Sequence, residues 1–366
     1  MTLRATVTNE NGEGKLGDTP KPSTGRPSPP SPLFRRRLLQ AVVRFREAGI
    51  IVFILILSAL VSLRNPAFLT TGNLRDILLN ISILVIVALA QTMVIITRGI
   101  DLSVGSMIGL TAMMVSFTIV AFPGMPSVLA LPLGMALGAV LGSFNGVIVA
   151  FGGVPPIIAT LGTLSIYRGL IFFYSQGQWI NAYEMPAGFR ELAKGSPLGV
   201  PNLIVFAIIV AVAVYIFLTY ARTGRDIYAV GSNPDAARFA GIPTQRIVFL
   251  VFLLSGILCG LAGVLWASRF EAAQTNTALG FELQTVAAPV VGGVNIFGGS
   301  GSVLGVGLGA FLLGIINNAL TLVRISPFWQ LAVQGLLIPL AVIADATISR
   351  RLQRIVPRRG GVERET

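Results

Sequence analysis

Long apolar runs occupy most of the chain and indicate that it is surrounded by a lipid bilayer rather than by water. A run of about 20 apolar residues is long enough to cross a bilayer as a helix. The segment 283–294 is too short to cross alone as a regular helix, so we expect it to be broken or re-entrant. The sequence predicts an all-α integral membrane protein with about ten transmembrane segments, although nine or eight full crossings remain open. The expected segments lie near residues 48–66, 77–97, 103–122, 128–150, 154–174, 202–220, 247–267, 283–294, 303–323 and 328–346.

The composition agrees with a membrane protein and excludes several kinds of site. Hydrophobic residues make up 54% of the 366-residue chain and charged residues only 11%, whereas a soluble domain carries about 25% charged residues. The single cysteine cannot form a disulfide framework, and the absence of histidine excludes histidine-containing zinc sites and histidine acid/base chemistry. No nucleophile–base pair, metal cluster or pair of acids is evident. We therefore expect a chain that is not an enzyme and that binds no metal or cofactor.

The three lysines give no sign of a nucleotide site. Lys15, Lys21 and Lys194 all lie outside a Gly-x-x-x-x-Gly-Lys-Ser/Thr pattern, so the chain lacks the loop that grips phosphates in many ATPases. Its energy must therefore come from an ion gradient or from another chain.

Basic residues predict the orientation. Residues 1–44 are expected to form a disordered basic tail, residues 45–348 the membrane domain, and residues 349–366 a basic C-terminal tail. With both termini in the cytoplasm, the inner side carries 20 Lys and Arg residues and the outer side 6, or 16 against 6 without the first four of the tail. Because cytoplasmic loops are enriched in these residues, the net charge of +12 indicates a membrane protein rather than nucleic-acid binding.

Regularly spaced glycines predict close helix contacts. Gly134, Gly138, Gly142 and Gly146 follow one another at intervals of four, which places them on one flat stripe of a helix. Gly256 with Gly260, and Gly305 with Gly309, repeat the spacing. Ordinary helix packing is the favoured interpretation, and a pore-lining or dimer-contacting stripe is the alternative.

Two glycine-rich segments predict interruptions between helices. Asp101 and Ser103 precede an apolar run, where they can cap free backbone N–H groups; ion coupling by Asp101 is the alternative, since acids at membrane depth are often functional. Residues 99–106 can be aligned with residues 293–300, which include Asn295 and Gly299. This alignment suggests an internal duplication with broken helices.

Other polar groups lie within or between the apolar runs. Arg168 falls inside a predicted span, so it must face protein or water, by snorkelling, by an internal salt bridge or by contact with substrate. The predicted outer loop 175–201 contains Trp179 and Tyr183, which suit a membrane interface; a docking surface for a periplasmic partner is the alternative.

The segment 223–243, "TGRDIYAVGSNPDAARFAGIP", is expected to form a turn and one short cytoplasmic helix. Asn233 can cap the helix, Pro234 suits its first turn, Asp235 suits its dipole and Gly241 can end it. An exposed Phe239 on so short a helix would fit a groove in a partner. A surface helix that folds back on the membrane is equally compatible with the pattern.

Four segments, in this order, carry a resemblance to a known family. "GIDLSVGS", "GVPPIIATLGTLSIYRGL", "TGRDIYAVGSNPDAARFAGI" and "VGGVNIFGGSGSVLGVGLGAFLL" resemble the permease subunits of bacterial ABC importers for monosaccharides, the ribose/xylose/arabinose/galactoside group. The likeness runs from about residue 45 to residue 346. It implies a multi-pass protein of the bacterial inner membrane that translocates a monosaccharide.

The resemblance also implies partners. A second permease chain, identical or related, would complete the pore, a cytoplasmic ATP-binding subunit would bind ATP and Mg²⁺, and a periplasmic binding protein would deliver the sugar. In this family the cytoplasmic loop after the middle helices couples to the ATPase. The residues that the resemblance assigns to coupling, or that lie beside them in this loop, are Gly224, Arg225, Asp226, Ala229, Gly231, Asn233, Asp235, Ala237, Arg238, Phe239 and Gly241.

Two alternatives remain open at the level of sequence. An ion-coupled secondary transporter working alone would use acids such as Asp101, Glu282 and Asp345, but these lie at the edges of spans rather than in their middles. A permease of the same family for branched-chain amino acids or nucleosides is the nearer alternative. Asp101, Ser103, Arg168, Asn295 and Gly299 are the candidates for the pore or for broken helices.

Overall fold

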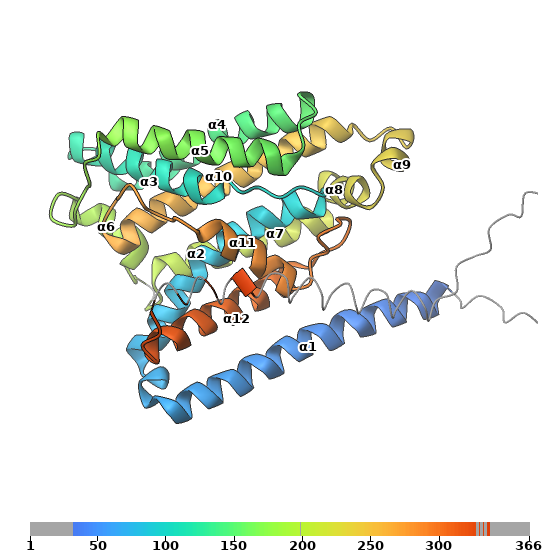
Figure 1. Ribbon diagram of the computed structural model, residues 1–366, viewed down its shortest axis with the longest axis horizontal. Coiled ribbons are helices and arrows are strands. Elements are labelled where there is room, and N and C mark those ends of the chain that lie inside the picture. Colours follow the sequence, from blue (N-terminus) through green and yellow to red (C-terminus); the bar gives the residue numbers. More distant parts are fainter. Residues whose placement is uncertain (1–31, 198, 327–328, 330–331, 333–334, 337–366) are drawn as a thin grey trace, which may run out of the picture. The chain divides into compact units, whose positions relative to one another are not determined.

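The computed structural model describes residues 32–197, 199–326, 329, 332 and 335–336. The chain divides into two units, Met1–Arg44 and Phe45–Thr366, and the architecture below is that of the second. Its described secondary structure is helical (Figure 1), apart from one isolated antiparallel bridge between Ile180 and Ala273.

The first helix, α1 (Pro32–Arg64), begins earlier than the sequence analysis placed it. Residues 32–44 are therefore helical, and their assignment to a disordered tail was wrong. The cause is visible in the sequence, because residues 35–48 are mostly Arg, Leu, Gln, Ala and Val, and Arg, Leu, Gln and Ala favour helices, while proline is tolerated in a first helical turn. The rest of the predicted N-terminal tail lies outside the described residues.

Eight described helical segments are long and apolar enough to cross a membrane. Val147–Phe151, a π-helical turn, extends α4 at its C-terminal end. The expected segment 283–294 is the short α11 (Phe281–Val291), as its length predicted. Most of the tenth predicted span, 328–346, and the C-terminal tail lie outside the described residues. The eight segments are Glu47–Arg64 of α1, α2 (Thr71–Ile96), α3 (Val104–Ala121), α4 (Ala130–Gly146) with its flanking turns, α5 (Pro156–Ser175), α7 (Asn202–Tyr220), α10 (Thr244–Phe270) and α12 (Val303–Leu322).

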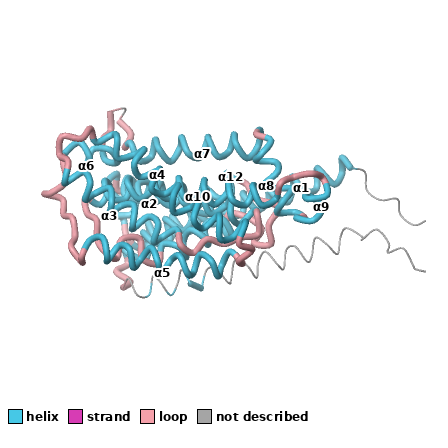
Figure 2. The backbone as a smooth tube through the Cα atoms, turned by 90° about the horizontal axis from the view of Figure 1, so that it is seen from above, coloured by secondary structure: helices cyan, strands magenta, loops and turns pink. Residues whose placement is uncertain are grey.

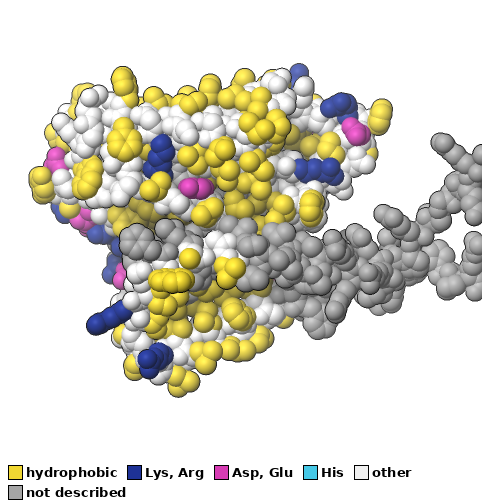
Figure 3. All heavy atoms as spheres, in the orientation of Figure 1, with side chains coloured by type: hydrophobic (Ala, Val, Ile, Leu, Met, Phe, Trp, Pro, Cys, Tyr) yellow, Lys and Arg dark blue, Asp and Glu magenta, His cyan; other side chains and the backbone are white. Residues whose placement is uncertain are grey.

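α2 and α10 form the centre of the helical body. α2 is the most buried of the eight segments, and α10 packs against α2, α3 and α4. Figure 2 shows α7 and α5 on opposite flanks of this centre. In the view of Figure 3, hydrophobic side chains cover much of the side of the body and most charged ones lie toward its ends. This distribution fits helices surrounded by lipid.

The glycine stripe of α4 packs against α10, as the favoured interpretation predicted. A β-carbon at Gly138 would overlap the Gly256 carbonyl oxygen, and one at Gly142 would overlap the Phe252 carbonyl oxygen. Each helix therefore approaches the other's backbone more closely than any side chain would allow. Gly309 of α12 contacts Ala288 and Gly292 at the end of α11 in the same way.

Two interruptions give the body an inverted internal pattern. α2 and α10 each end next to a left-handed residue, Arg98 (φ 67°) and Glu271 (φ 51°), and a non-helical stretch then leads to α3 and α11. The N-termini of these helices meet, because a β-carbon at Gly105 would collide with the Glu282 carboxylate. By element order, residues 271–280 are thus the counterpart of residues 97–103. Residues 293–300, which the sequence alignment had chosen, instead connect α11 to α12.

Candidate functional site: two ends and two interruptions

The helical body has two ends that differ in chemistry. The first, here called the α8–α9 end, carries α8 (Arg222–Ser232) and α9 (Pro234–Phe239). The second, called the α6 end, carries α6 (Ala187–Lys194), which is bound to the end of α10 because Ser268 Oγ donates to the Phe189 carbonyl and accepts from Ala193 N. α2 finishes at the α8–α9 end and α10 at the α6 end, so the two central helices point in opposite directions.

α9 has the capping chemistry that the sequence predicted. Asn233 Oδ1 accepts hydrogen bonds from Asp235 N at 3.1 Å and Ala236 N at 3.0 Å. Gly241 follows the helix with φ 79°, a conformation that glycine adopts without strain. Ala237 is buried, whereas the Phe239 side chain is 92% exposed. The most exposed aromatic ring of the described residues therefore lies on a helix of six residues.

The sequence analysis missed α8, since it expected a turn where an eleven-residue helix stands. Its buried face consists of Gly224, Ile227, Val230 and Gly231. The spacing of these four small or apolar residues by three, three and one was the available signal for an amphipathic helix. The coupling candidates are thus divided between two helices: Gly224, Arg225, Asp226, Ala229 and Gly231 lie on α8.

The C-terminus of α8 is bound to the end of α2 and to the 293–300 connection. Arg98 Nε donates to the Gly231 carbonyl at 2.6 Å, and its Nη2 donates to the Ser232 carbonyl at 2.7 Å. Gly299 N donates to the Ile96 carbonyl at 2.9 Å. A β-carbon at Gly231 would overlap that same Ile96 oxygen and lie 2.7 Å from Gly299 N. α8, the end of α2 and the 293–300 connection therefore meet backbone to backbone.

A further hydrogen bond and a turn complete this junction. Tyr228 on α8 donates its hydroxyl to the Gly301 carbonyl at 3.0 Å. Asn295 Oδ1 accepts from Phe297 N at 2.9 Å, which stabilises the turn that presents Gly299. Asn295 and Gly299, predicted as broken-helix candidates, thus shape the connection that α8 contacts.

Asp101 lies at the centre of a buried polar cluster in the first interruption. Asp101, Ser103 and Asn145 are fully buried. Asp101 Oδ1 accepts from Ser103 N at 2.9 Å and from Ser103 Oγ at 2.6 Å, while Asn145 Nδ2 donates to Ser103 Oγ at 2.8 Å. Asp101 thus satisfies a backbone N–H just before α3, whereas the Ser103 side chain caps no helical N–H. Asp101 Oδ2 has no hydrogen-bond partner among the described residues.

Arg168 bridges toward the second interruption. Its Nη1 donates to the Thr277 carbonyl at 2.7 Å, and Glu282 at the start of α11 attracts it electrostatically. The arginine therefore faces protein within the body, which is one of the arrangements the sequence left open. It joins α5 to the stretch that introduces α11.

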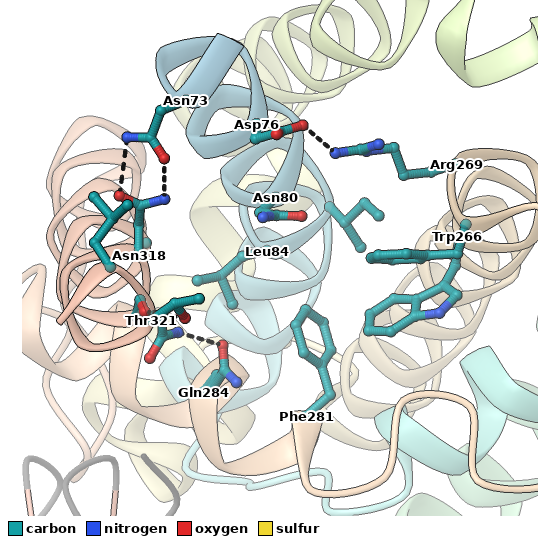
Figure 4. Close-up of a pocket in the computed structure, with 15 residues that line it drawn as sticks. Asn73, Asp76, Asn80, Leu84, Trp266, Arg269, Phe281, Gln284, Asn318 and Thr321 are labelled. Carbon is teal, nitrogen blue, oxygen red and sulfur yellow. Dashed lines mark hydrogen bonds and ion pairs between the residues drawn. The ribbon is translucent and has the colours of Figure 1, made fainter. Parts of the chain in front are cut away.

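At the α6 end, α2, α10, α11 and α12 surround a cavity of about 690 Å³. Figure 4 shows amide side chains on its α2 and α12 walls and the rings of Trp266 and Phe281 on the opposite wall. Asn73 and Asn318 exchange two hydrogen bonds, at 3.1 and 2.7 Å, and Arg269 pairs with Asp76 at 2.9 Å.

The sequence analysis made no prediction for this cavity. Asn73, Asp76 and Asn80 recur at intervals of three and four along α2, which places them on one helix face. This polar face on an apolar helix was a usable signal. Its partners on α12, however, lie some 240 residues further along the chain, and no local pattern connects the two.

Comparisons with known proteins agree with this architecture. Residues 73–342 match the family described as branched-chain amino acid transport system / permease component. The ribose import permease protein of Escherichia coli K12 is 39% identical over 306 residues, which cover 82% of this chain and 93% of that protein. The D-allose transport system permease protein of the same strain is 35% identical over 289 residues, covering 79% and 88%. The autoinducer 2 import system permease protein of Salmonella typhi is 34% identical over 317 residues, covering 87% and 90%. No solved structure matches the chain.

Proposed function

Because the chain belongs to the branched-chain amino acid transport system permease family, we propose that it is the membrane permease subunit of an ATP-driven ABC importer for a monosaccharide. The relatives' names support sugar rather than branched-chain amino acids as cargo, since they refer to ribose, allose and autoinducer 2. In this proposal the chain is a transporter component without an ATPase site of its own, and ATP and Mg²⁺ bind to a partner subunit.

The observation that carries the proposal is the exposed Phe239 on the capped helix α9. The preceding helix, α8, is hydrogen-bonded to the transmembrane body. A six-residue helix is too short to be stable alone in water, yet α9 is held by Asn233 and by the buried Ala237. Its apolar ring faces away from the protein, as expected for insertion into a groove of a cytoplasmic ATP-binding subunit. Asp235, Arg238 and Gly241 would border this contact.

The hydrogen bonds of α8 provide a path from that contact to the pore. Movement of α9 would pull on the Gly231 and Ser232 carbonyls, which Arg98 holds, and on the Gly299 junction. Arg98 lies in the first interruption, after α2, and Gly299 lies in the connection from α11 to α12, so the junction reaches both α2 and α11. The ATP-binding subunit can reorient the pore only if it binds the two orientations of the permease with different affinities. This junction is where that difference in affinity would act.

The proposal includes an orientation and an assembly. The α8–α9 end and both termini face the cytoplasm of a bacterial cell, and the chain spans the inner membrane. A periplasmic sugar-binding protein docks at the α6 end, where Trp179 and Tyr183 are exposed. A second permease chain, identical or related, completes the pore.

Transport by the reconstituted complex tests this function. In proteoliposomes that contain the permease, its ATPase and its binding protein, Phe239→Asp or deletion of residues 232–241 should abolish uptake of labelled sugar while the permease remains in the membrane. ATP hydrolysis should no longer respond to the loaded binding protein. Phe239→Leu, which keeps an apolar side chain, is the matched control and should retain uptake. Wild-type transport by the deletion variant would contradict the proposal.

A further inference from the structure

We propose that the cavity at the α6 end is a binding chamber for a neutral polyhydroxylated ligand, the monosaccharide itself, on its way through the permease. This inference rests on the proposed function and adds a substrate site to it. The cavity volume of about 690 Å³ lies within the usual range for small-molecule sites, about 300–1,000 Å³. A single sugar ring would share this space with water.

The charges in the cavity select against ionic ligands. Among the described residues that line it, only Asp76 and Arg269 are charged, and they neutralise each other in an ion pair with a distance of 2.9 Å. The charged groups of a zwitterionic amino acid would find a partner here only by displacing Asp76 from Arg269, which a neutral ligand does not need to do.

The remaining polar groups are suited to hydroxyls. Five amide side chains line the cavity, and each amide both donates and accepts hydrogen bonds, as a sugar hydroxyl also does. They are Asn73, Asn80, Gln284, Asn317 and Asn318. Trp266 and Phe281 form the opposite wall (Figure 4), with ring centroids 5.1 Å apart. A sugar ring has an apolar C–H face and a hydroxyl rim, so it matches a cavity with one aromatic and one amide wall.

Asn80 is the group best placed to bind the ligand directly. Asn73 is engaged with Asn318, and Asn317 donates to Gln284 at 3.1 Å. The Asn80 side chain, in contrast, has no hydrogen-bond partner within the described part of the chain and lies at the centre of the cavity (Figure 4). Asn80 is exposed, so its amide is open to a ligand that enters the cavity and can both donate to and accept from a sugar hydroxyl.

The amide pairs also connect ligand binding to the moving parts. Asn73–Asn318 joins α2 to α12, and Asn317–Gln284 joins α12 to α11. The other ends of α2 and α11 lead to Arg98 and Gly299 at the α8 junction. A shift of α11 relative to α2 would change the cavity, so the chamber can exist in one orientation of the pore and be altered in the other.

Direct titration tests the chamber. The chain has three tryptophans, so the full-length variant with Trp179→Phe and Trp329→Phe reports from Trp266 alone. In detergent, without partner proteins, D-ribose, D-allose and D-galactose are titrated in the millimolar range, because a transport chamber must also release its cargo. At least one sugar should change the fluorescence saturably, and L-leucine should not.

Matched variants locate the response. Asn80→Leu should raise the half-saturating sugar concentration about tenfold, the effect of losing one good hydrogen bond. Leu78→Ala, on the same helix but outside the cavity lining, should leave it unchanged. Asn80→Ala replaces Asn80→Leu if the larger side chain prevents folding. A response to none of the sugars, an equal response to L-leucine, or an Asn80 variant that titrates like the parent would overturn the proposal.

The titration is independent of the proposed function. ATP-driven uptake together with a silent Trp266 would reject the chamber and leave the permease assignment intact. Saturable sugar binding without any ATP-driven uptake would support the chamber and reject the assignment.

Discussion

The two ends of the helical body hold their helices together in different ways. At the α8–α9 end, backbone meets backbone: Gly231 allows the Ile96 carbonyl and Gly299 N to approach, and Arg98 holds the end of α8 with two hydrogen bonds. At the α6 end, α2, α11 and α12 are joined by amide pairs around a cavity. In the proposed mechanism the first arrangement transmits displacement, because backbone groups of neighbouring segments are in direct contact there. The second arrangement leaves space and hydrogen-bonding groups beside the helices.

The largest effect should come from Gly231→Ala. The added β-carbon would overlap the Ile96 carbonyl, and backbone groups cannot rotate away as a side chain can. We expect a loss of about 1–3 kcal/mol in the free energy of unfolding and loss of ATP-driven sugar uptake, measured by thermal denaturation in detergent and in proteoliposomes.

Gly162→Ala on α5 is the matched control, because no atom lies within 4 Å of its β-carbon position. The free energy of unfolding of this variant should be unchanged or higher by up to about 1 kcal/mol, since alanine has a higher helix propensity than glycine. Equal behaviour of the two alanine variants would show that backbone contact at the α8 junction is unimportant.

An intermediate effect is expected from Arg98→Ala. It removes both hydrogen bonds to the α8 carbonyls while the cavity at the α6 end stays intact. ATP-driven uptake should fall about tenfold, corresponding to roughly 1.4 kcal/mol of lost coupling, whereas the Trp266 response to sugar should be unchanged. Parallel measurement of uptake and fluorescence separates the two ends, and a variant that loses both would contradict their independence.

The smallest effect should come from an ion cluster at the α6 end. Glu271, the residue with a left-handed backbone directly after α10, forms ion pairs with Lys194 and Arg190. The hydrogen bond from Lys194 holds the pKa of the Glu271 carboxyl below its usual value. A lowered pKa in the folded state adds stability above the ordinary glutamate pKa of about 4.3, and this stability is lost as the pH falls toward the lowered value.

Partly exposed ion pairs contribute only about 0.2–1 kcal/mol. The thermal midpoint of the parent should therefore fall slightly more between pH 6 and pH 3.5 (the latter roughly one unit below the ordinary value) than that of Glu271→Gln. Identical pH profiles would show that the cluster adds nothing, and high salt should reduce the difference because it screens the pairs.

Local sequence signals predicted the parts of the fold that depend on a single segment. The apolar runs located the spanning helices, the shortness of segment 283–294 predicted α11, and Asn233 and Gly241 marked the two ends of α9. The glycine stripe of α4 predicted close packing but not its partner, because the choice of α10 depends on tertiary structure.

Features that join distant segments were beyond the reach of such signals. The cluster around Asp101 needs Asn145, and the cavity needs Asn318 opposite Asn73. Residues 271–280 were not recognised as an interruption because they lack the glycine-rich pattern of residues 99–106, although Ala278 and Gly280 both adopt left-handed backbone conformations there. The backbone interruption of residues 97–103 is repeated at residues 271–280 without a repeat of the sequence, so the alignment selected residues 293–300 instead.

Omission of the ATP-binding subunit from the reconstituted system tests most directly the claim that this chain depends on a separate ATPase. Labelled sugar should accumulate in proteoliposomes only when permease, ATP-binding subunit, loaded binding protein and ATP are all present, and an imposed proton or sodium gradient should not replace ATP. Concentrative uptake by this chain alone, driven by such a gradient, would contradict the account and identify an ion-coupled secondary transporter.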